Sequence, residues 1–341
     1  MSIALRVTCP RAMTETYRTF AEQSLHYFDR PHTEVPLSPI KSPAAWSGDE
    51  LRQAPETWQY QLSAPDIVEV LAAVRSMEGL SLGEIDRDNF PLPTLSPKIL
   101  KWRDAIMKGR GLMLVRGLPV WDWNMDTIER AYWGIGHHLG IPGGQNPDNE
   151  LLGHVKDYGE AKNDPFVRLY RTTANIRYHC DAADIVGLLC LHPAREGGES
   201  RIVSTVTLFN ELLNAHPEVA SRLFEPFKLD GRGERKPGQR PYSLIPPCRY
   251  SEGELRTFYH SDYFHSVERH EDVTLSEAET TILDFYDETG LQPGMYLDME
   301  LEAGDMQFIS NHVIAHARTE YVDFDEPAKK RHLLRLWLSA I

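Results

Sequence analysis

Apolar residues in the second half of the chain follow the patterns of β-strands. Residues 185–191 contain no polar side chain, which is typical of a strand buried on both faces. Residues 331–338 mix two arginines with apolar residues, and a strand turns successive side chains to opposite faces. One face of this last strand therefore carries Arg331, Leu333, Arg335 and Trp337.

Helical periodicity is found in the first half of the chain and again near residue 280. A helix is predicted from Ser63 to about Gly79. Its apolar stripe comprises Ile67, Val68, Val70, Leu71 and Val74. Asp126 is expected to cap a helix that runs to about residue 138. Ser276–Glu279 has the pattern of a capping box, which predicts the start of another helix.

Helices in the first half followed by β-rich segments predict a mainly β fold with flanking helices, arranged as a jelly-roll barrel. No Pro/Gly-rich linker divides the chain. We therefore predict a single domain over residues 1–341, in which residues 1–95 form an N-terminal extension packed on the barrel.

Composition narrows the class of protein. The net charge of −14 argues against nucleic acid as a partner, because phosphate contacts need a basic surface. No apolar run reaches the length of a membrane span, and residues 1–11 lack the apolar core of a signal peptide. We expect a cytoplasmic protein that binds a small molecule and no membrane, with a homo-oligomer left open. Without a CxxC pair, the cysteines are expected to be reduced: Cys9, Cys180, Cys190 and Cys248.

A histidine and a carboxylate two residues apart are a candidate metal pair, because on a strand they share one face. With a second histidine they complete the facial triad that holds non-haem iron. Among 14 His and 50 acidic residues several such pairs arise by chance. The chain has five of them, which begin at His32, His179, His216, His260 and His270.

Local context favours His179 with Asp181. The pairs at His32 and His216 lie beside prolines, and the pair at His270 lies in a polar segment. His179 precedes the buried run at residues 185–191. The pair His260–Asp262 is the rival, although its aromatic neighbours Phe258, Tyr259, Tyr263 and Phe264 indicate instead the wall of a substrate cavity.

The C-terminal part supplies the remaining candidates. His316 follows a turn at Gly304–Asp305 and a short strand, and we predict it as the second histidine ligand, with His312 in a structural role. Two arginines on one apolar strand face would be costly without anions to meet them. Arg331 and Arg335 therefore imply two anionic groups, a co-substrate and either a substrate or a buried carboxylate.

Together these residues resemble the TauD/TfdA family of oxygenases over the region from about Gly111 to the C-terminus. The resemblance implies a double-stranded β-helix of the clavaminate synthase-like type, with Fe(II), 2-oxoglutarate as co-substrate, and O2. It rests on Tyr178–Asp181, Gly197–Ser200, Gly304–Asp305, Asn311, His316, Arg331 and Arg335. The N-terminal region and the segment after His316 are longer than is usual in the family.

The resemblance also implies roles for individual residues. His179, Asp181 and His316 would ligate the iron. Ser200 would hydrogen-bond a carboxylate of 2-oxoglutarate, and Arg331 would pair with its distal carboxylate. The residues expected to contact the substrate are Arg335, Asn175, Tyr259 and Tyr263.

The expected activity couples oxidative decarboxylation of 2-oxoglutarate to C–H oxidation, by hydroxylation or desaturation, of a small organic anion. Related halogenases carry Gly or Ala at the position of Asp181, so the carboxylate here favours C–H oxidation. Two alternatives stay open. One is a metal-dependent cupin-type enzyme that does not use 2-oxoglutarate, and the other is a catalytically silent binding protein on the same fold.

Overall fold

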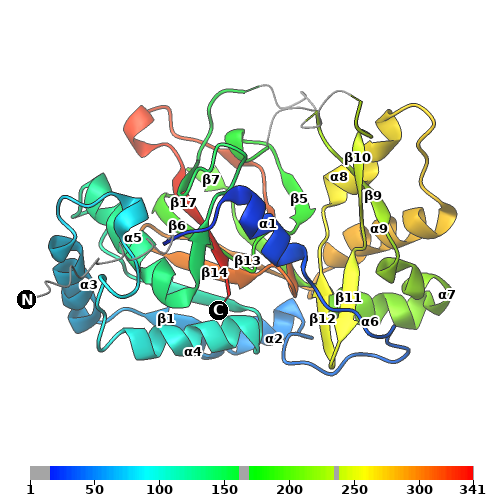
Figure 1. The fold of residues 1–341 in the computed structure, drawn as a ribbon, viewed down its shortest axis with the longest axis horizontal. Helices are drawn as coiled ribbons and strands as arrows, with labels where there is room; N and C mark the ends of the chain where they lie inside the picture. The colour runs from blue at the N-terminus through cyan, green and yellow to red at the C-terminus, as the bar shows by residue number, and fades with distance from the viewer. Residues whose placement is uncertain (1–15, 161–168, 234–237, 341) are drawn as a thin grey trace, which may run out of the picture.

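The computed structural model describes residues 16–160, 169–233 and 238–340. Cys9 and residues 1–15 of the expected N-terminal extension lie outside this part. The described residues form a large and a smaller β-sheet with helices on both sides, which is the predicted jelly-roll architecture. Figure 1 shows α3–α5 at one side of the barrel and α6–α9 at the other.

The large sheet is built from strands distant in sequence. Its strands are β1 (Gln59–Gln61), β2 (Leu112–Arg116), β3 (Ile141–Gly143), β4 (Gly153–Val155), β6 (Ile185–His192), β14 (Met306–Ser310) and β17 (His332–Ser339). Their order is β1-β2-β14-β6-β17-β3, and β4 also pairs with β17. The predicted buried strand β6 therefore lies between β14 and β17, as its apolar sequence requires.

The smaller sheet carries two of the candidate ligands. Its order is β13-β8-β15-β5, with antiparallel pairing between neighbours. These strands are β5 (Ile176–His179), β8 (Ser200–Ser204), β13 (Tyr296–Met299) and β15 (Ile314–Arg318). Short two-stranded pairs are formed by β7 (Glu196–Gly197) with β16 (Tyr321–Val322), β9 (Phe227–Asp230) with β10 (Tyr242–Ile245), and β11 (Cys248–Ser251) with β12 (Glu254–Thr257).

Helices cover the outer faces of both sheets. On the side of the large sheet are α3 (Ala64–Ser76), α4 (Ser96–Met107) and α5 (Met125–Leu139). Near the smaller sheet are α6 (Thr205–Ala215), α7 (Pro217–Ala220), α8 (Ser261–His265) and α9 (Glu277–Gly290). The N-terminal segment contributes α1 (Phe20–Phe28) and α2 (Gly48–Gln53).

The two faces of strand β17 pack against different parts of the core. Leu334, Leu336 and Leu338 pack in the cluster that joins the large sheet to its helices. Trp337, on the other face, packs between the two sheets, and Arg331, Leu333 and Arg335 line a cavity on that side. The predicted division of this strand into two faces is therefore confirmed.

The predicted helix starts differ from the structure in detail. Ser63 starts α3 as expected and forms a capping box there, and Ser276 forms the expected capping box of α9. Helix α5 is capped by Asn124, whose side chain accepts from the Thr127 N–H, and not by Asp126. Val68 was expected in the apolar stripe of α3 but is 67% exposed, because the helix buries Val70, Ala73 and Val74 instead.

The described part of the N-terminal extension packs on the barrel. Strand β1 pairs in parallel with β2 of the large sheet. Trp46, Leu51 and Trp58 are buried in the cluster that fills the space between the two sheets. The extension therefore contributes to the same core as the barrel, while the single-domain organisation stays a prediction. Among the described residues, every helix is too short or too polar to cross a membrane.

We expect the protein to lose stability in mild acid because of His137 on α5. Its side chain is buried, and its Nε2 has no hydrogen-bond partner among the described residues. Burial lowers the pKa of His137 to about 4, whereas an unfolded histidine titrates near pH 6.5. The unfolded state therefore binds the proton more tightly, so this contribution is complete above pH 6.5 and is lost as the pH falls towards 4.

Urea unfolding of the metal-free protein at pH 7 and pH 5 measures this effect. His137→Phe retains an aromatic ring beside Trp133 but cannot take up a proton. The variant should lose less stability than the parent between the two pH values. Equal losses would show that His137 does not contribute to the acid sensitivity.

Candidate metal centre

Three of the predicted ligands are brought together at one end of the smaller sheet. His179 ends β5, Asp181 lies in the turn that follows, and His316 is in the middle of β15. His316 is paired with His179 in the register of these antiparallel strands. One potential ligand atom from each of the three residues lies within 4.8 Å of the other two.

Each of the two histidines can present a ring nitrogen to a metal. Nδ1 of His179 lies 3.0 Å from the Arg177 carbonyl oxygen, and donation to that oxygen leaves Nε2 with a lone pair for a metal. Burial lowers the pKa of His316 to about 3, so its ring is neutral near pH 7. A metal needs deprotonated ligands, and His316 meets this condition.

Asp181 is held as a buried carboxylate. Burial favours the neutral acid, but the nearby Arg335 guanidinium is the largest of the effects that outweigh it, and the pKa of Asp181 stays below its ordinary value. The indole N–H of Trp337 donates to Oδ2 of Asp181 at 3.0 Å. Two imidazoles and one carboxylate beside a cavity form the donor set of a non-haem Fe(II) site, so these residues fit that metal.

Two of the three residues, His179 and Asp181, lie where two compartments of a cavity meet, and His316 lines one of these compartments. Both compartments are lined by His179, Asp181 and Arg335. The compartment that we call inner is also lined by Ser200, His316, Arg318, Arg331 and Leu333. The compartment that we call outer is also lined by Arg232, His260, Asp262 and Tyr263.

The inner compartment contains two buried arginines. Arg318 is 6% exposed and Arg331 is 5% exposed, and both guanidinium groups lie over the Tyr321 ring, at 4.8 and 5.0 Å. Nε and Nη1 of Arg318 and Nη1 of Arg331 have no hydrogen-bond partner among the described residues. Two adjacent buried cations with free donors require an anion that offers several oxygen atoms.

Arg318 was not among the residues predicted from the sequence. It lies two positions after His316 on β15, so strand geometry places both side chains on the same face, and this spacing is a signal that could have found it. Arg318 is also paired in register with Ser200 of β8. Burial and the charge of Arg331 lower the pKa of Arg318 to about 9, which leaves it a cation near neutral pH.

Ser200 and Arg331, which were predicted to hold the co-substrate, both line the inner compartment, and both already have partners in the protein. The Ser200 hydroxyl donates to Oε1 of Gln307 at 2.9 Å. Nη2 of Arg331 donates to the Gly198 carbonyl oxygen at 3.4 Å. These contacts orient the two side chains while part of the Arg331 guanidinium remains available.

Arg335 stands between the two compartments. Its Nε donates to Oε1 of Gln145 at 2.7 Å, and its Nη1 lies 3.8 Å from Oδ2 of Asp181. Its guanidinium also lies 4.8 Å from the centre of the Tyr170 ring. The sequence predicted that each arginine of the last strand meets an anion, either a bound molecule or a buried carboxylate. For Arg335 that anion is the buried carboxylate of Asp181.

The rival pair, His260 and Asp262, lies in the outer compartment beside the candidate ligands. The His260 ring is 5.2 Å from the His179 ring and stacks on Tyr263 at 3.6 Å. Asp262 is paired with Arg177 at 3.6 Å. Within the described residues, only His179, Asp181 and His316 form a group with metal-ligand spacing.

Two residues expected to contact substrate are placed elsewhere. Tyr259 is 1% exposed, and its hydroxyl donates to Oδ1 of Asp287 at 2.8 Å in the core. Successive residues in extended chain face opposite ways, so Tyr259 points inward where His260 faces the cavity. Asn175 is exposed and lines a neighbouring pocket that also contains Arg177 and Arg201. Tyr263 does line the outer compartment.

Comparison with known proteins agrees with this geometry. Residues 76–337 match the family described as taurine catabolism dioxygenase TauD, TfdA family. The chain is 29% identical over 312 residues to FR-33289 synthase of Streptomyces rubellomurinus, covering 90% of this chain and 92% of that protein. It is also 29% identical over 158 residues to a uridine-5'-phosphate dioxygenase of a Streptomyces species, covering 43% and 53% of the two chains.

A solved structure confirms the fold. Asparagine oxygenase, in complex with Fe(II), 3-hydroxyasparagine and succinate, superposes with a TM-score of 0.64 at 14% identity, covering 83% of this chain and 93% of that one. The family match includes all three candidate ligands and both inner arginines. The chain therefore belongs to the TauD/TfdA family and is an Fe(II)- and 2-oxoglutarate-dependent dioxygenase.

Proposed function

We propose that His179, Asp181 and His316 hold the iron, that the inner compartment binds 2-oxoglutarate, and that the outer compartment binds a small organic anion whose C–H bond is oxidised. The observation that carries this assignment is that the three ligands are grouped together and that two of them, His179 and Asp181, line both compartments. Bound iron supplies the oxygen chemistry that couples decarboxylation of 2-oxoglutarate to oxidation of the substrate.

The inner compartment matches a dicarboxylate. Arg318 and Arg331 receive its distal carboxylate with their unpartnered N–H groups. Ser200 lies on the neighbouring strand, and its hydroxyl would turn from Gln307 to donate to the carboxylate. Charge-assisted hydrogen bonds of this kind fix orientation as well as affinity. The other end of the molecule is then directed towards His179 and Asp181, while Val186, Leu188 and Leu333 provide apolar walls that exclude water.

The outer compartment matches a substrate with an anionic group. Arg335 and Arg232 both line it, and the Arg232 guanidinium lies 5.0 Å from the centre of the Tyr263 ring. The relative named for uridine-5'-phosphate supports a phosphate or similar anion as one substrate class. His260 and Tyr263 supply aromatic surface for the uncharged part of the molecule.

The two alternatives have less support. A cupin-type enzyme without 2-oxoglutarate, or a silent binding protein, leaves Arg318 and Arg331 buried beside each other without a use.

Cytoplasmic location, the absence of nucleic-acid and membrane partners, and a homo-oligomeric state stay predictions.

Anaerobic titration of 2-oxoglutarate into the Fe(II)-loaded protein tests the proposed function. Chelation of iron by the keto-acid end is expected to produce a weak visible charge-transfer band that saturates with one equivalent. The same titration without iron is the control. Tight iron binding with no band would contradict the assignment of the inner compartment to 2-oxoglutarate.

A further inference from the structure

The turn that carries Asp181 is tied to the loop between β14 and β15 by Asn311. This side chain is fully buried. Its Oδ1 accepts from the Asp181 N–H at 3.2 Å, and its Nδ2 donates to the Ala183 carbonyl oxygen at 2.9 Å. Because β15 starts at Ile314 and carries His316, one amide side chain connects the segments that present both ligands.

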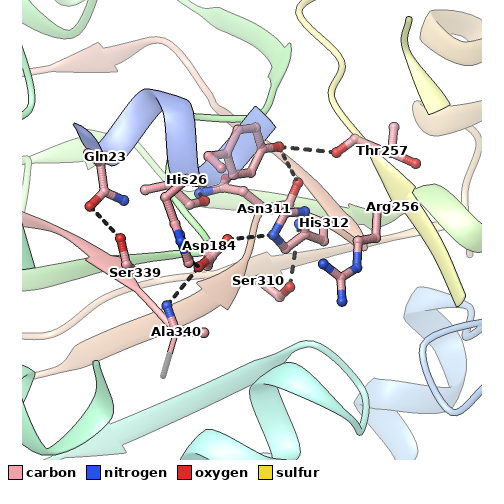
Figure 2. Close-up of polar contacts among 12 residues, drawn as sticks. Gln23, His26, Asp184, Arg256, Thr257, Ser310, Asn311, His312, Ser339 and Ala340 are labelled. Carbon is pink, nitrogen blue, oxygen red and sulfur yellow. Dashed lines mark hydrogen bonds and ion pairs between the residues drawn. The ribbon is translucent and has the colours of Figure 1, made fainter. Parts of the chain in front are cut away.

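Asp184 closes the same turn and receives hydrogen bonds from three directions. Nε2 of His312 donates to its Oδ1 at 2.7 Å. Its Oδ2 accepts from Nε2 of His26 on α1 at 2.9 Å and from the main-chain N–H of Ala340 at 2.7 Å. Figure 2 shows the Asp184 carboxylate between His26, His312 and Ala340. Burial alone would raise the pKa of Asp184, but these donors keep it below its ordinary value.

Tyr27, the next residue of α1, reaches the β14–β15 loop directly. Its hydroxyl lies 3.1 Å from the Asn311 carbonyl oxygen, and its ring stacks on His312 at 4.8 Å. Helix α1 therefore contacts both Asp184 and the loop that carries Asn311. Both α1 and Ala340 lie outside residues 76–337, the region that matches the family.

We propose that α1 and the main chain at Ala340 act as positioning elements of the metal centre, through Asp184 and Asn311. They hold the Asp181 turn against the start of β15, and so keep Asp181 and His316 at the separation that iron requires. The inference rests on the proposed function, because it assumes that these two residues are ligands. Loss of partners that orient metal ligands typically lowers metal affinity by about 10–100-fold.

Binding of Co(II) to the metal-free protein tests the proposal without relying on activity. Affinity is measured by competition with a chromophoric chelator, and geometry by the visible d–d spectrum. Asn311→Ala should weaken Co(II) binding by about 10-fold or more and alter the spectrum. His26→Ala should weaken it less, because His312 and Ala340 still hold Asp184, and His26→Gln should restore affinity through its amide N–H.

Ser339→Ala is the matched control. The Ser339 hydroxyl donates to Oε1 of Gln23 at 2.8 Å, so this variant also removes a buried hydrogen bond between α1 and the barrel. The change leaves the main chain at Ala340 in place, and the Ser339 side chain makes no hydrogen bond to Asp184 or Asn311, so the Co(II) affinity of this variant should equal that of the parent. Thermal unfolding of the metal-free variants shows the cost to stability of each change.

The outcomes separate this inference from the proposed function. If Asn311→Ala and His26→Ala lower the melting temperature as Ser339→Ala does, but keep the affinity and spectrum of the parent, α1 has only a structural role and the inference is wrong. If His316→Ala binds Co(II) as well as the parent does, the ligand assignment itself fails, and the inference falls with it.

Discussion

Replacing His316 by alanine is expected to reduce Fe(II) affinity by more than about 100-fold and to abolish oxygenase activity. Loss of an outer partner of a ligand already costs about 10–100-fold, and the loss of one of three ligands should exceed that. His316 is buried, and its Nε2 lies 3.8 Å from Oδ2 of Asp181. Iron content after anaerobic loading and desalting, with succinate release, measures both effects.

His260→Ala is the control for this experiment. His260 is also a histidine beside His179, with the two rings 5.2 Å apart, but it is not one of the three grouped residues. This variant should retain iron, whatever its effect on substrate binding in the outer compartment. Loss of iron from His260→Ala together with its retention by His179→Ala would instead favour the rival pair, His260 and Asp262.

Replacing Arg331 by leucine is expected to weaken 2-oxoglutarate binding by about 10–150-fold, with iron still bound. A hydrogen bond to a charged group contributes roughly 1.5–3 kcal/mol, and each 1.4 kcal/mol is about tenfold in affinity. Arg318→Gln should act in the same direction, because the free donors of both side chains lie in the inner compartment. The charge-transfer titration gives the affinity of each variant.

Arg201→Gln provides a matched control for the two inner arginines. Arg201 lies on β8, next to Ser200, and is paired in register with Ala317. Its guanidinium binds Asp298 through two contacts of 2.7 Å outside the inner compartment. The variant should bind 2-oxoglutarate as the parent does. Unchanged affinity in Arg331→Leu and Arg318→Gln would mean that the co-substrate carboxylate is held elsewhere.

The different roles expected for Arg331 and Arg335 follow from their different surroundings in the cavity. Strand β17 separates the environments of Arg331 and Arg335, which are four residues apart on one face. Arg331 lies beside a second cation, Arg318, and its Nη1 has no hydrogen-bond partner among the described residues. Arg335 instead lies near the Asp181 carboxylate and donates to Gln145. Two identical side chains on one strand therefore have different electrostatic roles.

The candidate site was only partly predictable from residue patterns. Spacing alone does not distinguish five His-x-carboxylate pairs, and the choice of His179 depended on its neighbours and on the family resemblance. The aromatic cluster near His260 indicated a cavity wall but did not distinguish Tyr263, which lines it, from Tyr259, which is in the core. That distinction depends on how the chain turns before α8.

Local patterns were enough to predict the two faces of β17, the starts of α3 and α9, and the residue types available for a metal, because these depend on neighbours a few positions apart. The contacts between distant segments could not be predicted in this way: Arg318 shares a compartment with Arg331, and His26 meets Asp184, 158 residues away. Such contacts form when separate strands and helices pack around a common core. Their distances are therefore fixed by the whole fold and are not encoded in any local pattern.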